Sequence, residues 1–453
     1  MQTLSANPIL NNPYLEPKRH YFTNLDGSLS YEKEPQSFRR PFIPSTPPSP
    51  VKKAKHQLEV FSTADFHPKE EHLVTLLRRE VSLWRKSEYN GFNDVTRVTK
   101  NLLSYWFLNP DRTITKQLFF AQREVIETTI WLNEVAEKSN VGSFILAKLQ
   151  AERKNLGEIL PRTSFKMATG TGKTVVMALQ ILYHFFNRRE YRNDIRFDDN
   201  FLVIAPGVTV RDRLQVLFAD NWNKDKRHIK DVYYDRDLVP PNLREDLPLL
   251  NTKLVVTNYH TFEPRQLKGK FVGALDGKKG SNYQKPEESF TTVIKRVLKF
   301  KLDTRLLIIN DEAHHCYLPK VKARDSEDGE MTAKDNAAAS IWYNALRQLA
   351  EKFKLRNVYD LSATPYYMQG SGMPAGLLFP WLATDYGLVD AIEAGLVKIP
   401  FLPERDNTYA GLSDSILKNI YPVVKSHLPK KNSPHLPEPF FPDDVIHSLS
   451  TNK

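Results

Sequence analysis

A glycine-rich turn between two apolar stretches gives the clearest chemical pattern in this chain. It reads MATGTGKT, from Met167 to Thr174, and the segment VVMALQILYHFF that follows is typical of a helix. Glycines let a turn approach a ligand closely, and backbone N–H groups at a helix start converge on phosphate oxygens. The pattern predicts a phosphate-binding loop in which Lys173 reaches the β- and γ-phosphates and Thr174 ligates Mg²⁺. The residues predicted to hold the nucleotide are Thr169, Gly170, Thr171, Gly172, Lys173 and Thr174.

Met167 departs from the general phosphate-loop pattern, which has glycine at this place. The residue lies at the entrance of the loop and not at its crown, so a side chain is tolerated there if φ stays negative. We therefore expect nucleotide binding to survive. The alternative is a Gly-Thr-rich helix cap that matches by accident.

An acidic pair follows the apolar run RLLIIN, in the order Asp311, Glu312, Ala313, His314. Carboxyl ends of buried strands are where α/β folds bind ligands. We expect Asp311 to hold Mg²⁺ through water and Glu312 to orient and deprotonate an attacking water. Alone, such a pair is usually a solvated loop. His314 and His315 form a poor zinc site without further Cys or His ligands, and Cys316 is expected to pack and not to act as a nucleophile.

Two further segments contain polar residues that suit the same site. In LSATP, the hydroxyl groups of Ser362 and Thr364 are expected to hydrogen-bond the acidic group and His314 and to sense the γ-phosphate. In FFAQREV, the amide of Gln122 is expected to read adenine, with Phe119 or Phe120 near the base. The alternatives are a simple strand end and a solvated helix residue.

Four short apolar runs predict the buried strands that would position these residues. They are FLVIAP (201–206), LVVTNY (254–259), LLIIND (306–311) and NVYDLSATP (357–365), with RTSFKM as a short further candidate. Helical segments at 173–187 and 337–353 separate some of them, which predicts a doubly wound α/β fold with a mainly parallel sheet. Two polar stretches, 263–289 and 320–335, are expected to be surface insertions.

The region before this alternation has a different character. Proline is concentrated in the first 50 residues, which predicts an extended arm that is flexible or wraps the surface. From residue 61 to 160, apolar residues recur at helical spacing. The examples are Leu73, Leu76, Leu77, Val81 and Trp84, then Val125, Ile126, Ile130 and Val135.

Composition limits the class of protein. Hydrophobic residues make up 41% of the 453 residues, enough for a core, and no apolar run is long enough to span a membrane. The first residues lack the pattern of a signal peptide, and one cysteine excludes an internal disulfide, so the sequence favours the cytoplasm. A net charge of +11 favours polyanionic partners, although many basic proteins bind no nucleic acid.

Taken in order, these motifs resemble the first RecA-like lobe of superfamily 2 helicases and translocases, which are P-loop NTPases with a DEAH box. The matching elements are FFAQRE, MATGTGKT, VIAPGVTVRDRL, VVTNYHTF, NDEAHH and LSATP. The form MATGTGKT is similar to that of restriction-enzyme motor subunits, in which methionine at this place is ordinary. The resemblance implies ATP and Mg²⁺ as cofactors.

The chain further resembles the restriction (Res) subunit of type III restriction–modification enzymes. The segments NNPYLEPKRHYF, DEAHHCY, YDLSATPYYMQGSG and LFPWLATDYGLVDAIEAGLVKIP carry this resemblance. It implies ATP-dependent translocation on duplex DNA coupled to a nuclease, with a modification methyltransferase as a partner. It also implies that five residues face the DNA backbone, and each of them could equally belong to a turn at a strand end. They are Pro206, Thr209, Arg211, Thr257 and Asn258.

Two features of such enzymes are not found in the later part of the sequence. No Arg-rich QxxGRxxR motif follows Thr364, and no Asp…Glu-x-Lys nuclease spacing is found near the end. We expect an extended arm at 1–60, a helical region at 61–115, the first lobe at 116–385 and a linker toward an absent second lobe at 386–453. Without a second chain to supply that lobe and the nuclease, we expect ATP binding, weak DNA binding and little activity. The alternatives are another superfamily 2 DNA or RNA helicase and a non-catalytic fragment that binds DNA or a partner.

Overall fold

The computed structural model divides the chain into two compact units, residues 1–398 and 399–453. All the residues that it describes lie in the first unit, and they are 7–23, 29–30, 33–43, 71–86, 92–219, 231–266, 287–317, 329–368, 371, 373–374 and 376–398. Most of the predicted linker at 386–453 therefore lies outside the described residues.

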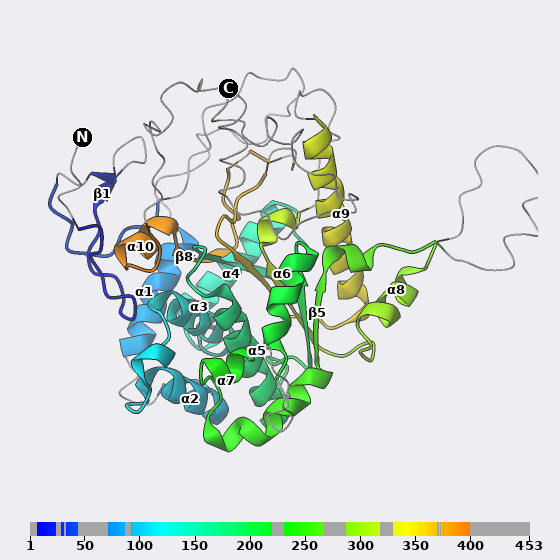
Figure 1. Ribbon diagram of the computed structural model, residues 1–453, viewed down its shortest axis with the longest axis horizontal. Helices are drawn as coiled ribbons and strands as arrows, with labels where there is room; N and C mark the ends of the chain where they lie inside the picture. Colours follow the sequence, from blue (N-terminus) through cyan, green and yellow to red (C-terminus); the bar gives the residue numbers. More distant parts are fainter. Residues whose placement is uncertain are drawn as a thin grey trace, which may run out of the picture. The chain divides into compact units, whose positions relative to one another are not determined.

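A six-stranded parallel sheet organises the first unit (Figure 1). Its strands lie in the order β5-β4-β6-β7-β3-β8. The bounds are β3 Arg162–Met167, β4 Asn200–Ala205, β5 Leu254–Asn258, β6 Leu306–Asp311, β7 Val358–Ser362 and β8 Leu382–Tyr386. The fold class predicted from the sequence, an α/β lobe with a parallel sheet, is confirmed.

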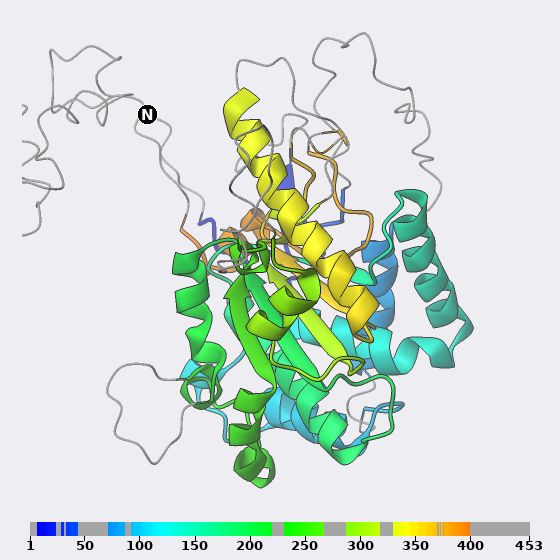
Figure 2. The ribbon, with the colours of Figure 1, turned by 90° about the vertical axis from the view of Figure 1, so that its right-hand side faces the viewer.

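Helices cover both faces of this sheet, which explains why β4, β5 and β6 are mostly apolar runs. Along β4, Leu202 and Ile204 pack with Trp342 and Leu346 of α9 (Gly329–Lys352). Figure 2 shows α9, in yellow, lying across that face of the sheet. The alternate residues of β4 point to the opposite face, as the two-residue period of a strand requires.

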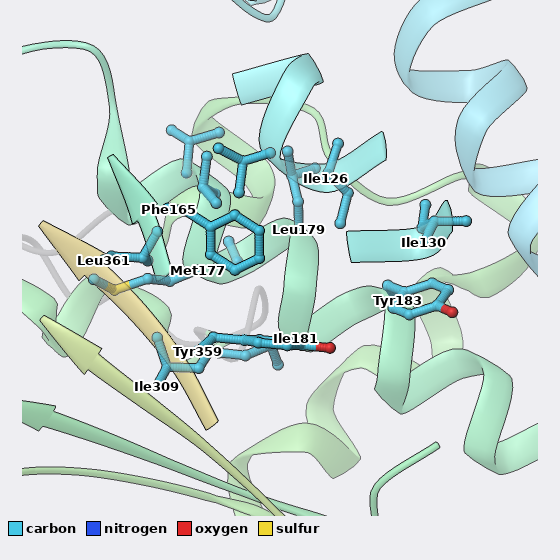
Figure 3. Packing of buried hydrophobic residues seen from close by; sticks show 14 of the residues in the cluster. Ile126, Ile130, Phe165, Met177, Leu179, Ile181, Tyr183, Ile309, Tyr359 and Leu361 are labelled. Carbon is cyan, nitrogen blue, oxygen red and sulfur yellow. The ribbon is translucent and has the colours of Figure 1, made fainter. Parts of the chain in front are cut away.

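The opposite face packs on the helix that follows the glycine-rich turn, α5 (Lys173–Glu190), and on α3 (Phe120–Ile130). Figure 3 shows Phe165 and Leu361 of the sheet near Leu179 of α5 and Ile126 of α3. All four of these side chains are fully buried. This packing fixes the start of α5 relative to the sheet edge.

The other helices surround this core. Their bounds are α1 Leu73–Lys86, α2 Arg97–Leu103, α4 Asn140–Asn155, α6 Val208–Arg213, α7 Val232–Asp235, α8 Phe290–Val297 and α10 Leu388–Glu393. The 3-10 and π segments are η2 Ser104–Leu108, η3 Ile114–Lys116, η4 Trp131–Val135, η5 Ala136–Lys138, η6 Leu214–Leu217, η7 Pro241–Thr252, η8 Tyr259–Phe262 and η10 Ala313–His315.

The proline-rich N-terminal region contains no helix among its described residues, as expected. It forms a two-stranded antiparallel pair, β1 (Phe22–Thr23) with β2 (Leu29–Ser30), and lies beside α10 (Figure 1). Backbone N–H groups of Leu10 and Asn11 donate to the Glu393 carbonyl at 2.7 and 2.9 Å. This region therefore packs on the lobe.

Several elements differ from the sequence prediction. Strand β8 was not predicted, because its residues Leu382–Tyr386 include Thr384 and Asp385 and form no apolar run. The polar stretch 320–335 is not wholly an insertion, since α9 begins at Gly329. The domain boundaries remain predictions, and β8 and α10 extend the same packed unit past residue 385.

Candidate functional site

The parallel register brings three of the predicted motifs to one edge of the sheet. Strand β3 lies beside β7 with Lys166 opposite Ser362, and β7 lies beside β6 with Leu361 opposite Asp311. All three strands run in the same direction. The glycine-rich turn, the acidic pair and the LSATP segment therefore follow the carboxyl ends of neighbouring strands, where α/β folds bind ligands.

The turn after β3 has the backbone geometry of a phosphate-binding loop. Met167 ends the strand with its side chain fully buried in the core, which explains why methionine is accepted there. Gly170 and Gly172 have φ angles of 87° and 90°, values that disfavour any residue with a Cβ. Helix α5 then begins at Lys173, so the N–H groups of Lys173 and Thr174 have no partner within the helix, whereas the Val175 N–H donates to the Gly172 carbonyl at 3.0 Å.

Gln122 braces this loop from helix α3. Its Nε2 donates to the Thr171 carbonyl at 3.2 Å, while its Oε1 accepts from the Phe119 N–H at 2.9 Å. A Cβ added to Gly172 would lie 2.1 Å from that same Nε2. The whole residue is 4% exposed, and its amide retains one lone pair and one N–H for a further partner. The predicted adenine contact stays a prediction, and the role in bracing the loop was not foreseen.

Lys173 and Glu312 come together across the sheet edge, and the Lys173 ammonium donates a hydrogen bond to Glu312 Oε1. Glu312 adopts a left-handed backbone conformation, with φ and ψ both 50°. For a residue other than glycine this costs about 1–3 kcal/mol, and such strain concentrates at functional sites. The turn directs the Glu312 carboxylate toward the start of α5.

Asp311 lies beside this pair, and only 6% of it is exposed. Burial raises its pKa to about 6, and the neighbouring Glu312 carboxylate adds to the rise while the Lys173 ammonium opposes it. A buried carboxylate of this kind is stabilised by a divalent cation. With the Thr174 hydroxyl it offers the oxygen ligands that Mg²⁺ prefers, and Mg²⁺ usually takes its other ligands from phosphates and water. The residues present therefore fit the predicted metal.

His314 links the acidic pair to the LSATP segment. The Ser362 hydroxyl lies 2.9 Å from His314 Nδ1 and also accepts from the Thr364 N–H at 3.0 Å. Burial, helped by the adjacent His315, lowers the pKa of His314 to about 4. A neutral ring can accept the Ser362 proton at Nδ1, so the arrangement is a chain of neutral hydrogen bonds across β6 and β7. The three residues predicted to couple the motifs are thus in contact.

The residues predicted to face DNA lie at the same sheet edge, three of them after β4 and two at the carboxyl end of β5. Pro206 is half-buried and Thr209 is exposed. The Arg211 guanidinium pairs with the carboxylate of its neighbour Asp212 at 2.7 Å. Thr257 and Asn258 are 6% and 3% exposed, so they offer little surface in this conformation. Their contact with DNA stays a prediction.

A buried charged network beneath the site was missed in the sequence. Arg162 Nε donates to Asp360 Oδ2 at 2.7 Å, and its Nη1 donates to the Cys316 carbonyl at 2.9 Å. Asp360 also accepts from Asn310 Nδ2 at 2.8 Å. The available signals were Asp360 inside the mostly apolar run of β7 and Arg162 at the start of β3. Cys316 itself is fully buried, and burial raises the pKa of its thiol well above the usual range, as suits a packing role.

Comparison with known proteins agrees with this geometry. The family model described as "Type III restriction enzyme, res subunit" matches residues 115–367, more than half of the 453 residues. No curated protein matches the chain. Among the described residues, no helix has the length and apolar character needed to cross a membrane. The chain contains a superfamily 2 helicase-like ATPase domain and belongs to the family of type III restriction enzyme res subunits.

Proposed function

We propose that this chain binds Mg²⁺-ATP at the turn between β3 and α5 and hydrolyses it to drive movement on duplex DNA within a type III-like restriction system. The observation that carries the proposal is the contact between Lys173 and Glu312. These two residues belong to different motifs and are 139 positions apart in the sequence. Lys173 is the positive group of the loop, and Glu312 is the acid that a hydrolase needs beside the γ-phosphate.

The loop supports binding of a triphosphate and not only of a single phosphate. Backbone N–H groups at the start of α5 and the Lys173 ammonium would share the negative charge of the β- and γ-phosphates. When bound, Mg²⁺ supplies further positive charge, held through Thr174 and Asp311. Gln122 keeps Thr171 in place from the other side of the loop.

Glu312 is the proposed general base for the attacking water. In this conformation its carboxylate is occupied by Lys173, which a phosphate oxygen can replace as partner of the ammonium. The carboxylate then becomes free to accept a proton from water. His314 and Ser362, fixed to each other at 2.9 Å, would hold the neighbouring strand ends in register during this exchange.

Binding to DNA is supported by the family and by the basic composition. A net charge of +11 favours a polyanion through release of counterions. The residues proposed to meet the DNA backbone are Pro206, Thr209 and Arg211 after β4, and Thr257 and Asn258 at the carboxyl end of β5. These strands are neighbours, so the two groups lie side by side at the sheet edge.

Two variants test the nucleotide site by calorimetry with Mg²⁺-ATP. Lys173→Ala should abolish measurable binding, while Lys301→Ala, an exposed lysine in the loop before β6, should bind as the wild type does. Equal affinity in all three proteins would refute the site.

Turnover tests the chemistry and the nucleic acid. Glu312→Gln should keep ATP affinity and lose about 10²–10⁴-fold in turnover, the range for a general base. Wild-type turnover should rise with duplex DNA and not with single-stranded RNA. Stimulation by RNA alone would instead indicate a different superfamily 2 helicase.

A further inference from the structure

A cavity of about 160 Å³ lies between the sheet and the helices α3 and α4, at the end of the sheet where β3 and β7 begin. Pro161 and Thr163 line it at the start of β3, and Asn357 lines it directly before β7. The phosphate loop follows the other end of β3, so this cavity is separate from the nucleotide site. Because a water molecule takes about 30 Å³ in the liquid, the space suits a ligand of only a few heavy atoms.

The charged side chains that line the cavity are Arg153, Arg356 and Glu137. Arg153, on α4, is half-buried, and its Nη1 donates to the Arg162 carbonyl at 3.2 Å. No carboxylate of the described residues forms an ion pair with it. Burial lowers the pKa of Arg153 from its usual value, and the Glu158 carboxylate opposes the fall. A guanidinium has five N–H groups, so Arg153 keeps donors for another acceptor.

Arg356 has a carboxylate partner, but the contact is weak. Its Nη2 lies 3.4 Å from Glu137 Oε1, and the Glu137 side chain is 67% exposed. An ion pair this exposed contributes little to stability. A competing anion can therefore replace Glu137 at little cost, and it can enter the cavity from the exposed side on which Glu137 lies.

The uncharged polar side chains of the cavity divide into two groups. Thr129 and Asn133 donate at 2.9 and 3.0 Å to groups that do not line the cavity. Asn357 instead has a buried Nδ2 without a hydrogen-bond partner in the part of the chain that the structure describes. A buried donor without an acceptor is unfavourable. The groups available at Arg153, Arg356 and Asn357 are thus donors, and donors require a ligand that accepts.

The remaining lining of the cavity is largely apolar. It includes Leu132, Leu146, Leu149 and Phe165. Small-molecule sites commonly combine such a lining with a few polar groups that fix the orientation of the ligand. An inorganic ion would leave these apolar side chains without a contact, whereas an organic anion can use both parts of the cavity.

We propose that this cavity binds a small organic anion, with its carboxylate or phosphate oxygens at Arg153, Arg356 and Asn357 and a short hydrocarbon part against the leucines. The anion replaces Glu137 at Arg356 and supplies the acceptors that Arg153 and Asn357 lack. Hydrogen bonds between ionised groups are about twice as strong as neutral ones, so two guanidinium groups favour an anion over a neutral ligand of the same shape.

Saturation-transfer NMR on the full chain can measure the binding of sodium butyrate and of propyl phosphate, with butyramide as the neutral analogue. At least one anion should bind about tenfold more tightly than butyramide, and the tighter of the two identifies the head group. Arg153→Gln and Arg356→Gln should each weaken that binding about tenfold. Arg347→Gln, which removes an exposed guanidinium from α9, is the matched control and should have no effect.

Two further variants separate this cavity from other anion sites. Leu146→Phe keeps every charge and fills the space, so it should also weaken binding. Lys173→Ala should bind the anion as the wild type does, because the phosphate loop lies at the other end of β3.

Each opposite result would overturn the inference. Equal binding of butyramide and both anions, or no binding at all, would show that the arginines select no anion. Unchanged affinity in Arg356→Gln would do the same even if Arg153→Gln failed to fold, since the Arg356 side chain is 31% exposed and tolerates substitution better. Loss of binding in Lys173→Ala would place the anion in the phosphate loop and leave the proposed function standing.

Discussion

Two ion pairs connect β3 and the helix that follows it to β7 and to the residue after β6, and the two pairs differ in burial. Arg162 and Asp360 have side chains that are 1% and 0% exposed, and each makes further hydrogen bonds inside the sheet. Lys173 and Glu312 have side chains that are 13% and 28% exposed at the sheet edge. Within the described residues, Glu312 is the hydrogen-bond partner of the Lys173 ammonium.

This difference separates a structural pair from an exchangeable one. A buried charge that loses its partner has no water to replace it, so the interior pair must persist in every state of the fold. An edge pair can be opened by solvent or by a competing anion at little cost. A cation paired with a carboxylate therefore stabilises the lobe at Arg162 and Asp360. At Lys173 and Glu312 the same kind of pair leaves a cation available for a phosphate.

Matched substitutions of the two cations give the largest expected contrast. Arg162→Met leaves the Asp360 carboxylate buried without its cation and should lower the free energy of unfolding by about 3–5 kcal/mol. Lys173→Met should lower it by at most about 1 kcal/mol, the range for a partly exposed pair. Unfolding in urea, followed by circular dichroism, measures both. Similar losses in the two variants would contradict the comparison.

Double-mutant cycles sharpen the same contrast with a smaller effect. Asp360→Asn keeps an oxygen for Asn310 and removes the buried charge, so it should recover part of the Arg162→Met loss. We expect a coupling free energy of about 2 kcal/mol for this cycle and below about 1 kcal/mol for Lys173→Met with Glu312→Gln. Additive losses at the interior pair would show that the two charges do not stabilise each other.

The residues at the carboxyl ends of the strands were easier to predict from the sequence than the charged contacts inside the sheet. Buried strands that end in polar residues are local patterns, so β4, β6, β7 and the loop at Met167 to Thr174 could be read directly. Arg162 and Asp360 are 198 positions apart, and only the register of β3 beside β7 makes them partners. Local patterns carry no information on that register.

The same reason explains the other omissions. Strand β8 has mixed polarity because Asp385 pairs with Lys166 of β3 at 2.9 Å, a contact that replaces apolar packing. The N-terminal region was expected to be an extended arm, and its proline content shows only that it cannot be helical. Its attachment to α3 and α10 depends on Glu124 and Glu393, which look like ordinary helix residues in the sequence.

The close packing of Gln122 against the phosphate loop can be tested by substituting Gly172. Gly172→Ala should lower the free energy of unfolding by about 1–3 kcal/mol, the cost of a strained backbone, and also weaken ATP binding, because its Cβ would displace Gln122. Gly157 has a φ of 71° and nothing within 4 Å of an added Cβ, so Gly157→Ala should show the backbone cost alone. Equal ATP affinity in the two variants would mean that Gln122 does not brace the loop.

Another buried pair, between α5 and the segment before β4, gives the smallest predicted effect and tests how interior charges are held. His184 Nδ1 lies 3.2 Å from Asp198 Oδ2, and both side chains are fully buried. Burial raises the pKa of Asp198 to about 7 and, with the positive charge of Arg356, lowers the pKa of His184 to about 3. Between about pH 4 and 6.5 the folded pair therefore carries one proton, on Asp198.

The unfolded pair also carries one proton in that window, on the histidine, whose usual pKa is about 6.5 against about 3.9 for aspartate. The pair thus adds no pH dependence to the stability of the wild type. In Asp198→Asn the folded state keeps His184 neutral while the unfolded state binds a proton, so stability falls as the pH decreases. From pH 6.0 to 5.0 the variant should lose about 1.3 kcal/mol more unfolding free energy than the wild type does. Parallel pH profiles for the two proteins would show instead that the folded pair holds its proton on His184 or holds none.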